Sequence, residues 1–101
     1  MKKLIQNNPP HPGKVLCEYY LKPLGMNITE ASVRFLITRP NLSSIVNQKS
    51  GISAVMALKL AKAFKTTPQY WMNLQGNYDL WQATKTTEEV LKKVQEPTRK
   101  Q

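Results

Sequence analysis

Small polar side chains and one arginine are concentrated between residues 38 and 50. Arginine can donate two hydrogen bonds to the edge of a guanine, and asparagine can form a matching pair with adenine. Serine and threonine are short enough to let a helix approach bases or phosphates closely, and a lysine beside them can neutralise a backbone phosphate. These residue types and their spacing predict contacts to nucleic acid from Thr38, Arg39, Asn41, Ser43, Ser44, Asn47, Lys49 and Ser50.

The element that must present these side chains is a helix over residues 39–47. Thr38 is a suitable N-cap, and Pro40 falls in a first helical turn, where a missing N–H is tolerated. The positions spaced to face a core are Leu42, Ile45 and Val46. Helices that are merely solvated more often carry Glu and Lys pairs, which favour a helix more than Ser or Asn does. The outward face is therefore unusual for a plain surface helix.

A shorter helix is predicted immediately before it. Asn27 is a good N-cap, and Ile28, Ala31 and Phe35 share one helical face. Two short helices joined by a three-residue turn, here residues 36–38, are how a helix-turn-helix motif places its second helix in the major groove of DNA. An ordinary helical hairpin with a solvated second helix is the alternative.

The rest of the chain is also predicted to be helical, which makes the fold all-α with about five helices. A first helix over residues 12–22 would stop at Pro23 and Gly25. A fourth, capped by Ser53, is expected to bury Ala54, Ala57, Leu58, Ala61 and Phe64. A fifth begins after Thr67 with Pro68. The organisation that follows is a flexible arm over residues 1–11, a helix-turn-helix domain over 12–84, and a tail over 85–101 with a short helix capped by Thr87.

The charge of the chain favours a polyanionic partner. The 101 residues include 15 Lys and Arg against 6 Asp and Glu, a net charge of +9, and no acid occurs between Ala31 and Tyr78. Paired carboxylates, a nucleophile beside a base and a glycine-rich phosphate loop are all lacking, so an enzyme is not expected, and neither is a cofactor. His11 is interpreted as a structural residue before a helix rather than a metal ligand. One cysteine and no long apolar run predict a cytoplasmic protein without a membrane span.

Several segments together resemble the HigA-type antitoxins of the lambda-repressor-like (XRE) helix-turn-helix family. They are His11-Pro12-Gly13, residues 21–25, residues 44–53, residues 57–64, and Trp71-Met72-Asn73-Leu74-Gln75 with Tyr78-Asp79-Leu80-Trp81. The resemblance covers residues 9–84. It implies a dimeric five-helix DNA-binding domain that represses its own operon and neutralises a HigB-type toxin, which cleaves messenger RNA.

The chain departs from this family at positions that matter for DNA contact. Leu36 stands where glycine is usual, in the turn between the two helices, and Gln48 also replaces a glycine. Ile28 replaces a glutamine that grips phosphate in related proteins, so that role would fall to Asn27 or Thr29.

The aromatic stripe of the fifth helix admits two interpretations. Trp71, Leu74, Tyr78 and Trp81 could belong to the core, or they could form the seam of a homodimer, since aromatic residues are enriched at such interfaces. Two other functions also stay open at this point. One is a solitary phage-like repressor without a toxin partner, and the other is a helical protein-interaction module whose basic face meets acidic proteins.

Overall fold

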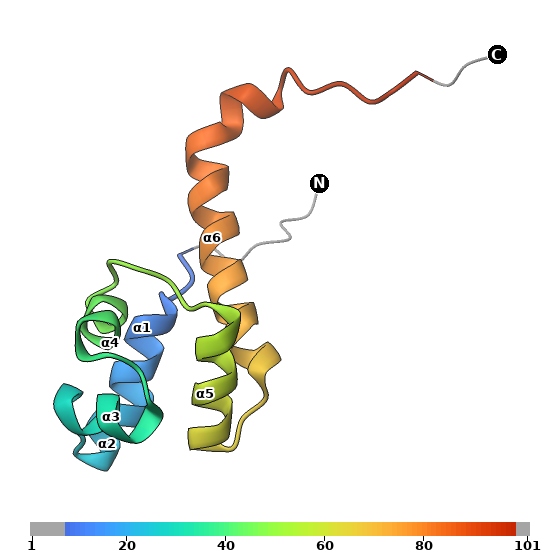
Figure 1. The fold of residues 1–101 in the computed structure, drawn as a ribbon. Helices are drawn as coiled ribbons and strands as arrows, with labels where there is room; N and C mark the ends of the chain where they lie inside the picture. Colours follow the sequence, from blue (N-terminus) through green and yellow to red (C-terminus); the bar gives the residue numbers. More distant parts are fainter. Residues whose placement is uncertain (1–7, 99–101) are drawn as a thin grey trace.

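The computed structural model describes residues 8–98, and the regular elements in that part of the chain are helices. The first helix combines α1 (Pro12–Leu16), a π-helical turn η1 (Cys17–Leu21) and α2 (Lys22–Leu24) without a break. It is followed by α3 (Ile28–Phe35), α4 (Arg39–Val46), α5 (Ala54–Phe64) and α6 (Pro68–Leu91). The predicted all-α fold with five helices is thus confirmed. The helices up to α5 gather into a compact body, and the second half of α6 extends away from it (Figure 1).

The first helix runs through Pro23, so the predicted end at residue 22 is wrong. A proline inside an α-helix normally clashes with the carbonyl four residues earlier. Here the preceding turn is π-helical, with the Lys22 N–H bonded to the Cys17 carbonyl five residues back, and this wider turn accommodates the ring. The helix ends at Gly25, the second of the two predicted stops, whose φ of 65° is the left-handed conformation that glycine adopts without strain.

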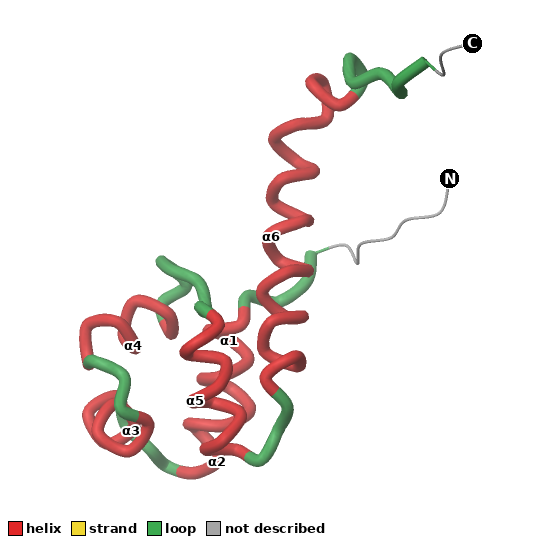
Figure 2. The backbone as a smooth tube through the Cα atoms, turned by 45° about the vertical axis from the view of Figure 1, so that its right-hand side comes forward, coloured by secondary structure: helices red, strands yellow, loops and turns green. Residues whose placement is uncertain are grey.

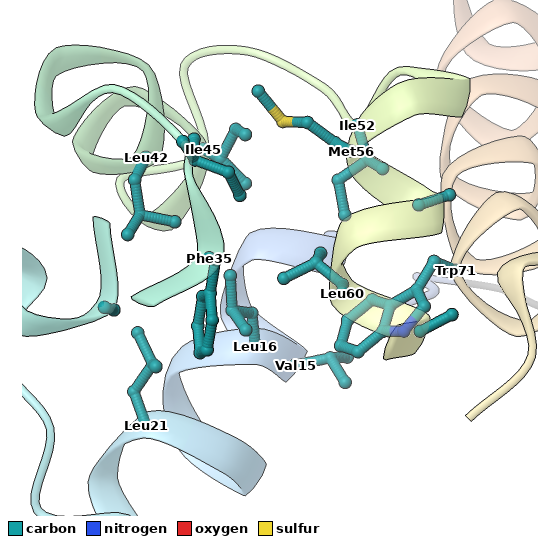
Figure 3. Close-up of a cluster of buried hydrophobic side chains, with 14 residues drawn as sticks. Val15, Leu16, Leu21, Phe35, Leu42, Ile45, Ile52, Met56, Leu60 and Trp71 are labelled. Carbon is teal, nitrogen blue, oxygen red and sulfur yellow. The ribbon is translucent and has the colours of Figure 1, made fainter. Parts of the chain in front are cut away.

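The core joins all five helices around a small set of fully buried side chains. Leu16 from α1, Leu42 and Ile45 from α4, Leu60 from α5 and Trp71 from α6 have no exposed surface (Figure 3), and neither has Ala31 from α3. Together they fix α4 against the body, because its apolar face packs inward while its polar face stays outside. The side of the molecule that α4 presents is therefore set by the core.

The buried stripe of α5 is rotated relative to the prediction. Met56 and Leu60 face the core, whereas Leu58 is 58% exposed and Ala54 is exposed as well. Both stripes contain Ala57, Ala61 and Phe64 and have helical spacing, so periodicity alone does not separate them. The packing of Trp71 from α6 and Phe35 from α3 against this helix decides between the two.

The N-terminal residues 1–7 of the predicted arm lie outside the described residues. The rest of that segment is not an arm, because Pro9 and His11 are buried against the body. His11 is the N-cap of α1: its Nδ1 accepts a hydrogen bond from the Gly13 N–H at 2.9 Å. The imidazole also packs edge-on against Tyr78 of α6, with ring centroids 4.8 Å apart. The expectation of a structural histidine is confirmed.

The cap formed by His11 should make stability depend on pH. Burial lowers the pKa of His11 below its usual value, although Asp79 partly opposes this shift. The imidazole is therefore neutral in the fold, and protonation would place an N–H where Nδ1 now accepts. Because the folded-state pKa is the lower one, the stabilisation is complete above the unfolded pKa of about 6.5 and is lost as the pH falls below it.

Thermal unfolding at a series of pH values between 8 and 5 tests this dependence. Asparagine can cap a helix but does not titrate, so the His11→Asn variant is the matched control. We expect the wild-type melting temperature to fall more steeply than that of the variant as the pH drops below about 6.5. Parallel curves for the two proteins would contradict the role of the histidine.

Helix α6 continues to Leu91, so the prediction of a separate short helix capped by Thr87 is also wrong. Thr87 does not cap a new helix, because its hydroxyl donates to the Ala83 carbonyl one turn earlier at 2.6 Å. Thr84 bonds back to Leu80 in the same way, at 2.7 Å. Because these hydroxyls are bonded to carbonyls of the preceding turn, they do not accept from backbone N–H groups as the cap of a new helix would. The boundary predicted at residue 84 therefore falls inside one helix.

Candidate nucleic-acid interface

Helices α3 and α4 pack against each other and are joined by the turn over residues 36–38, the arrangement of a helix-turn-helix motif (Figure 2). Helix α3 starts as predicted: Asn27 forms a capping box with Glu30, in which the Asn27 Oδ1 accepts from the Glu30 N–H at 2.8 Å. Helix α4 starts after Thr38, whose hydroxyl does not cap it. The two helices are thus positioned by local signals at their starts and by a shared core.

The turn between the helices depends on a strained residue. Leu36 has φ 56° and ψ 43°, the left-handed conformation, and its N–H bonds to the Ser32 carbonyl. A non-glycine residue loses about 1 kcal/mol or more there. The Leu36 carbonyl accepts a hydrogen bond from Lys59 Nζ at 2.5 Å, which ties the turn to α5. The turn keeps its helix-turn-helix geometry although glycine is replaced.

Glycine at this position should relieve the strain. The Leu36 side chain is 77% exposed, so its removal sacrifices little packing. We expect Leu36→Gly to raise the free energy of unfolding by up to about 1 kcal/mol, measured by urea denaturation. Val33→Gly is the control, because Val33 is similarly exposed but lies inside α3, where glycine should instead cost about 1 kcal/mol. If both variants were less stable than the wild type, the left-handed conformation of Leu36 would not be a source of backbone strain.

The exposed face of α4 carries the polar residues that the sequence singles out. Arg39 and Asn41 are exposed at its first turn, and Ser43 and Ser44 are half-buried further along. Asn47 is exposed but turns back onto the helix, since its Nδ2 donates to the Ser43 carbonyl at 2.9 Å. Reading an adenine would require this amide to release that bond. The first turn of α4 is therefore the part most available for base contact.

Arg39 is held in place by a residue of the neighbouring helix. Its Nε donates to the Thr29 Oγ1 at 2.9 Å, while the two terminal nitrogens of this exposed side chain have no hydrogen-bond partner among residues 8–98. The Asn27 Oδ1 is occupied in its capping box and the Thr29 Oγ1 accepts from Arg39, and the phosphate contact expected of these two exposed residues stays a prediction. Thr29 supports an arginine, a contact that the sequence analysis did not predict.

The turn that follows α4 presents Lys49 but not the hydroxyl of Ser50. Lys49 is exposed, whereas the Ser50 Oγ is buried and has no hydrogen-bond partner among the described residues. The expected phosphate contact from the Ser50 side chain does not fit this orientation. Gln48 follows the end of α4 and adopts the left-handed conformation with φ 63°, at the position where the resemblance leads us to expect glycine.

The cations around this face have no nearby carboxylate partner among residues 8–98. The two ion pairs in this part of the chain join Glu18 to Lys22 and Glu89 to Lys92, both away from α4. The positive side chains on α3 to α5 and their connections are Arg34, Arg39, Lys49, Lys59, Lys62 and Lys65. An unneutralised positive surface around a polar helix matches what a phosphate backbone attracts.

The aromatic stripe divides between core and surface. Trp71 is completely buried, and its Nε1 donates to the Thr66 Oγ1 at 2.8 Å, so it is a core residue and not part of a dimer seam. Leu74, Tyr78 and Trp81 are only partly buried and follow one another along α6, next to Leu80, which is 55% exposed. Leu74 also packs against the core and Tyr78 against His11, so only part of the surface of Leu74, Tyr78 and Trp81 is free for a partner.

Metal sites and membrane-spanning helices were the two other features sought among the described residues. No group of three or more His, Cys, Asp or Glu within residues 8–98 is arranged to hold a metal ion. None of the helices in the same range combines the length and apolar character that crossing a membrane needs.

Comparison with known proteins identifies the family. A family model described as helix-turn-helix matches residues 18–71, which include α3, α4 and α5. The chain belongs to the helix-turn-helix family. Virulence-associated protein A' of Dichelobacter nodosus is 54% identical over 76 residues, which cover 74% of this chain and 65% of that protein. The match thus spans just under two thirds of the relative.

Solved helix-turn-helix structures agree with the fold almost from end to end. Antitoxin GraA superposes with a TM-score of 0.86 at 32% identity, covering 91% of this chain and 100% of GraA. The antitoxin HigA of Pseudomonas aeruginosa, solved with the higBA promoter, gives a TM-score of 0.84 at 32% identity and covers 91% of this chain and 100% of that one. The resemblance to HigA-type antitoxins of the helix-turn-helix family is confirmed.

Proposed function

We propose that this protein is an antitoxin that represses its own operon by binding operator DNA. The observation that carries the proposal is Arg39 at the start of α4, supported by Thr29 and set in an exposed polar face without acids. With α4 in the major groove, the two free nitrogens of Arg39 can donate to guanine and Asn41 can pair with adenine. The similarity to HigA solved with its promoter supports this use of the surface.

A symmetric dimer would place two such helices on one operator. Helix-turn-helix dimers bind half-sites about 34 Å apart, one DNA turn, because each subunit reads one major groove. The partly buried stripe of Leu74, Tyr78 and Trp81 on α6 is the surface we propose for the dimer seam. Trp71 is excluded from it because the residue is buried within one subunit.

The proposed second partner is a HigB-type toxin that cleaves messenger RNA. The similarity to the antitoxins HigA and GraA over about nine tenths of the chain supports this partner. Both operator DNA and messenger RNA are cytoplasmic in bacteria, so the cytoplasm is the proposed location. The chain acts by binding, and no catalytic role is proposed for it.

Co-expression tests the antitoxin role. The small reading frame next to this gene would be induced alone and together with the chain, and growth would be followed. Arrest by the neighbour and rescue by the chain support an antitoxin. Operator binding without any toxic neighbour would instead identify a solitary repressor. Dimerisation without binding to any DNA would favour a protein-interaction module.

Lys49 should contribute affinity but no sequence preference. It lies exposed in the turn after α4, where a backbone phosphate would pass. We expect Lys49→Ala to weaken binding to operator and random duplexes equally and to reduce the slope of log affinity against log salt by about 0.9, the value for one phosphate. Lys92→Ala is the control, since Lys92 pairs with Glu89 near the end of α6 and should leave the slope unchanged. An unchanged slope for Lys49→Ala would exclude this contact.

A further inference from the structure

The side chain of Gln75 connects α6 to the turn that follows α4. Its Oε1 accepts a hydrogen bond from the backbone N–H of Ile52 at 2.7 Å, although the two residues are 23 positions apart. Its Nε2 donates to the Asp79 Oδ1 one helical turn further along α6, at 2.9 Å. The amide is thus held at both ends. In Figure 1 the segment between α4 and α5 crosses over to reach α5 where that helix lies beside α6.

Gly51 fits closely over this amide. A Cβ atom at position 51 would lie 2.8 Å from the carbon, nitrogen and oxygen of the Gln75 carboxamide, closer than real contacts allow. The φ of Gly51 is not in the left-handed range, so glycine is needed here for space rather than for conformation. The backbone of the turn and the Gln75 side chain are therefore packed as one unit.

The rest of the turn is held by local contacts. The N–H groups of Gln48 and Lys49 bond back to Ile45 and Ser44 within α4, at 2.9 and 2.8 Å. Ser50 contributes no side-chain hydrogen bond in the described part of the chain. Together with the burial of the Ile52 side chain in the core, the bond from Ile52 to Gln75 joins the turn that carries Lys49 to α6.

We propose that Gln75 is a positioning residue that sets the turn carrying Lys49 and so couples α6 to DNA binding. This inference rests on the proposed function for its DNA-binding part. A shift of α6, for example when a second copy binds along it, would move the turn and Lys49 through the Gln75 amide. Coupling between two sites is reciprocal, so DNA bound at the turn would change association along α6 by the same factor.

Three variants isolate this contact. Gln75→Leu keeps the size of the side chain and removes both hydrogen bonds. Gln75→Glu retains an acceptor for Ile52 but places a carboxylate against Asp79. Adding Asp79→Asn to Gln75→Glu restores both bonds with the second one reversed, because the amide introduced at position 79 then donates to the new carboxylate. The doubly substituted protein has the same net charge as the wild type and is the matched rescue.

Two measurements on the full chain test the proposal. Hydrogen exchange of the Ile52 amide should accelerate in Gln75→Leu and return to the wild-type rate in the double variant. In operator titrations, Gln75→Leu should lower the salt slope by about 0.9, and adding Lys49→Ala to it should lower the slope no further. The rescue variant should regain the wild-type slope.

The outcomes separate this inference from the proposed function. Unchanged exchange at Ile52, or additive effects of Gln75→Leu and Lys49→Ala on the salt slope, would overturn the positioning role. A wild-type chain that binds no operator would overturn the proposed function and, with it, the DNA-binding part of the inference. The exchange of Ile52 would then still decide whether Gln75 holds the turn.

Discussion

Replacing Arg39 by alanine should weaken operator binding by about 1–3 kcal/mol, roughly 5- to 150-fold, and should relax the base preference at one position of each half-site. The reason is that the Arg39 side chain is already positioned, before DNA binds, to donate two hydrogen bonds to guanine. Its Nε is already bound to Thr29, so binding DNA does not have to order a freely rotating side chain. The affinity is measured by titration against operators with single base changes.

Arg34→Ala is the matched control for this prediction. Arg34 is also exposed and carries the same charge, but it lines an apolar groove with Leu36 and Leu58 between α3 and α5. Its loss should reduce binding to all duplexes slightly and leave base preference intact. If Arg39→Ala behaved in the same way, Arg39 would be a general cation and not a reader of sequence.

Gly13→Ala is expected to have the largest effect on folding. Gly13 lies where α1 crosses α4, and a Cβ there would overlap the carbonyl oxygen of Ile45 in the candidate recognition helix. Both groups belong to the backbone, so no side chain can move aside. We expect the free energy of unfolding to fall by about 3 kcal/mol or more, the upper end for overpacking, as measured by urea denaturation.

Gly76→Ala is the control for Gly13→Ala: it makes the same chemical change, but we expect it to raise stability. Gly76 lies in the interior of α6, and an added Cβ there would meet nothing within 4 Å. Alanine should raise stability by about 0.5–1 kcal/mol, because glycine loses more conformational freedom in a helix. Equal effects of the two substitutions would show that α1 and α4 do not depend on their close approach at Gly13.

The starts of the helices could be predicted from the sequence because their signals are local. Asn27, Ser53 and Thr67 each cap the helix that follows, by accepting a backbone hydrogen bond three residues further on. The alternation of buried and exposed residues on α4 was equally predictable, since Leu42 and Ile45 face inward. A few residues that are neighbours in the sequence are enough to determine each of these features.

The errors arose where distant residues decide the outcome. The rotation of α5 depends on which neighbours it meets, and the burial of Trp71 depends on α5 lying over it. The first helix (α1, η1 and α2) continues through Pro23 because of a π-helical turn that has no clear sequence signal. The contacts from Thr29 to Arg39 and from Gln75 to Ile52 span 10 and 23 positions, and neither is visible in a local pattern.

The most direct test of the account is a titration of the purified protein into DNA from immediately upstream of its gene, beside a scrambled duplex of the same composition. The central claim is that α4 reads a specific sequence. We expect tight binding centred on a palindrome, lost in the Arg39→Ala, Asn41→Ala double variant, with the scrambled duplex bound weakly by both proteins. Equal, weak and salt-sensitive binding to both duplexes would contradict the claim and would attribute the affinity to the net charge of +9 alone.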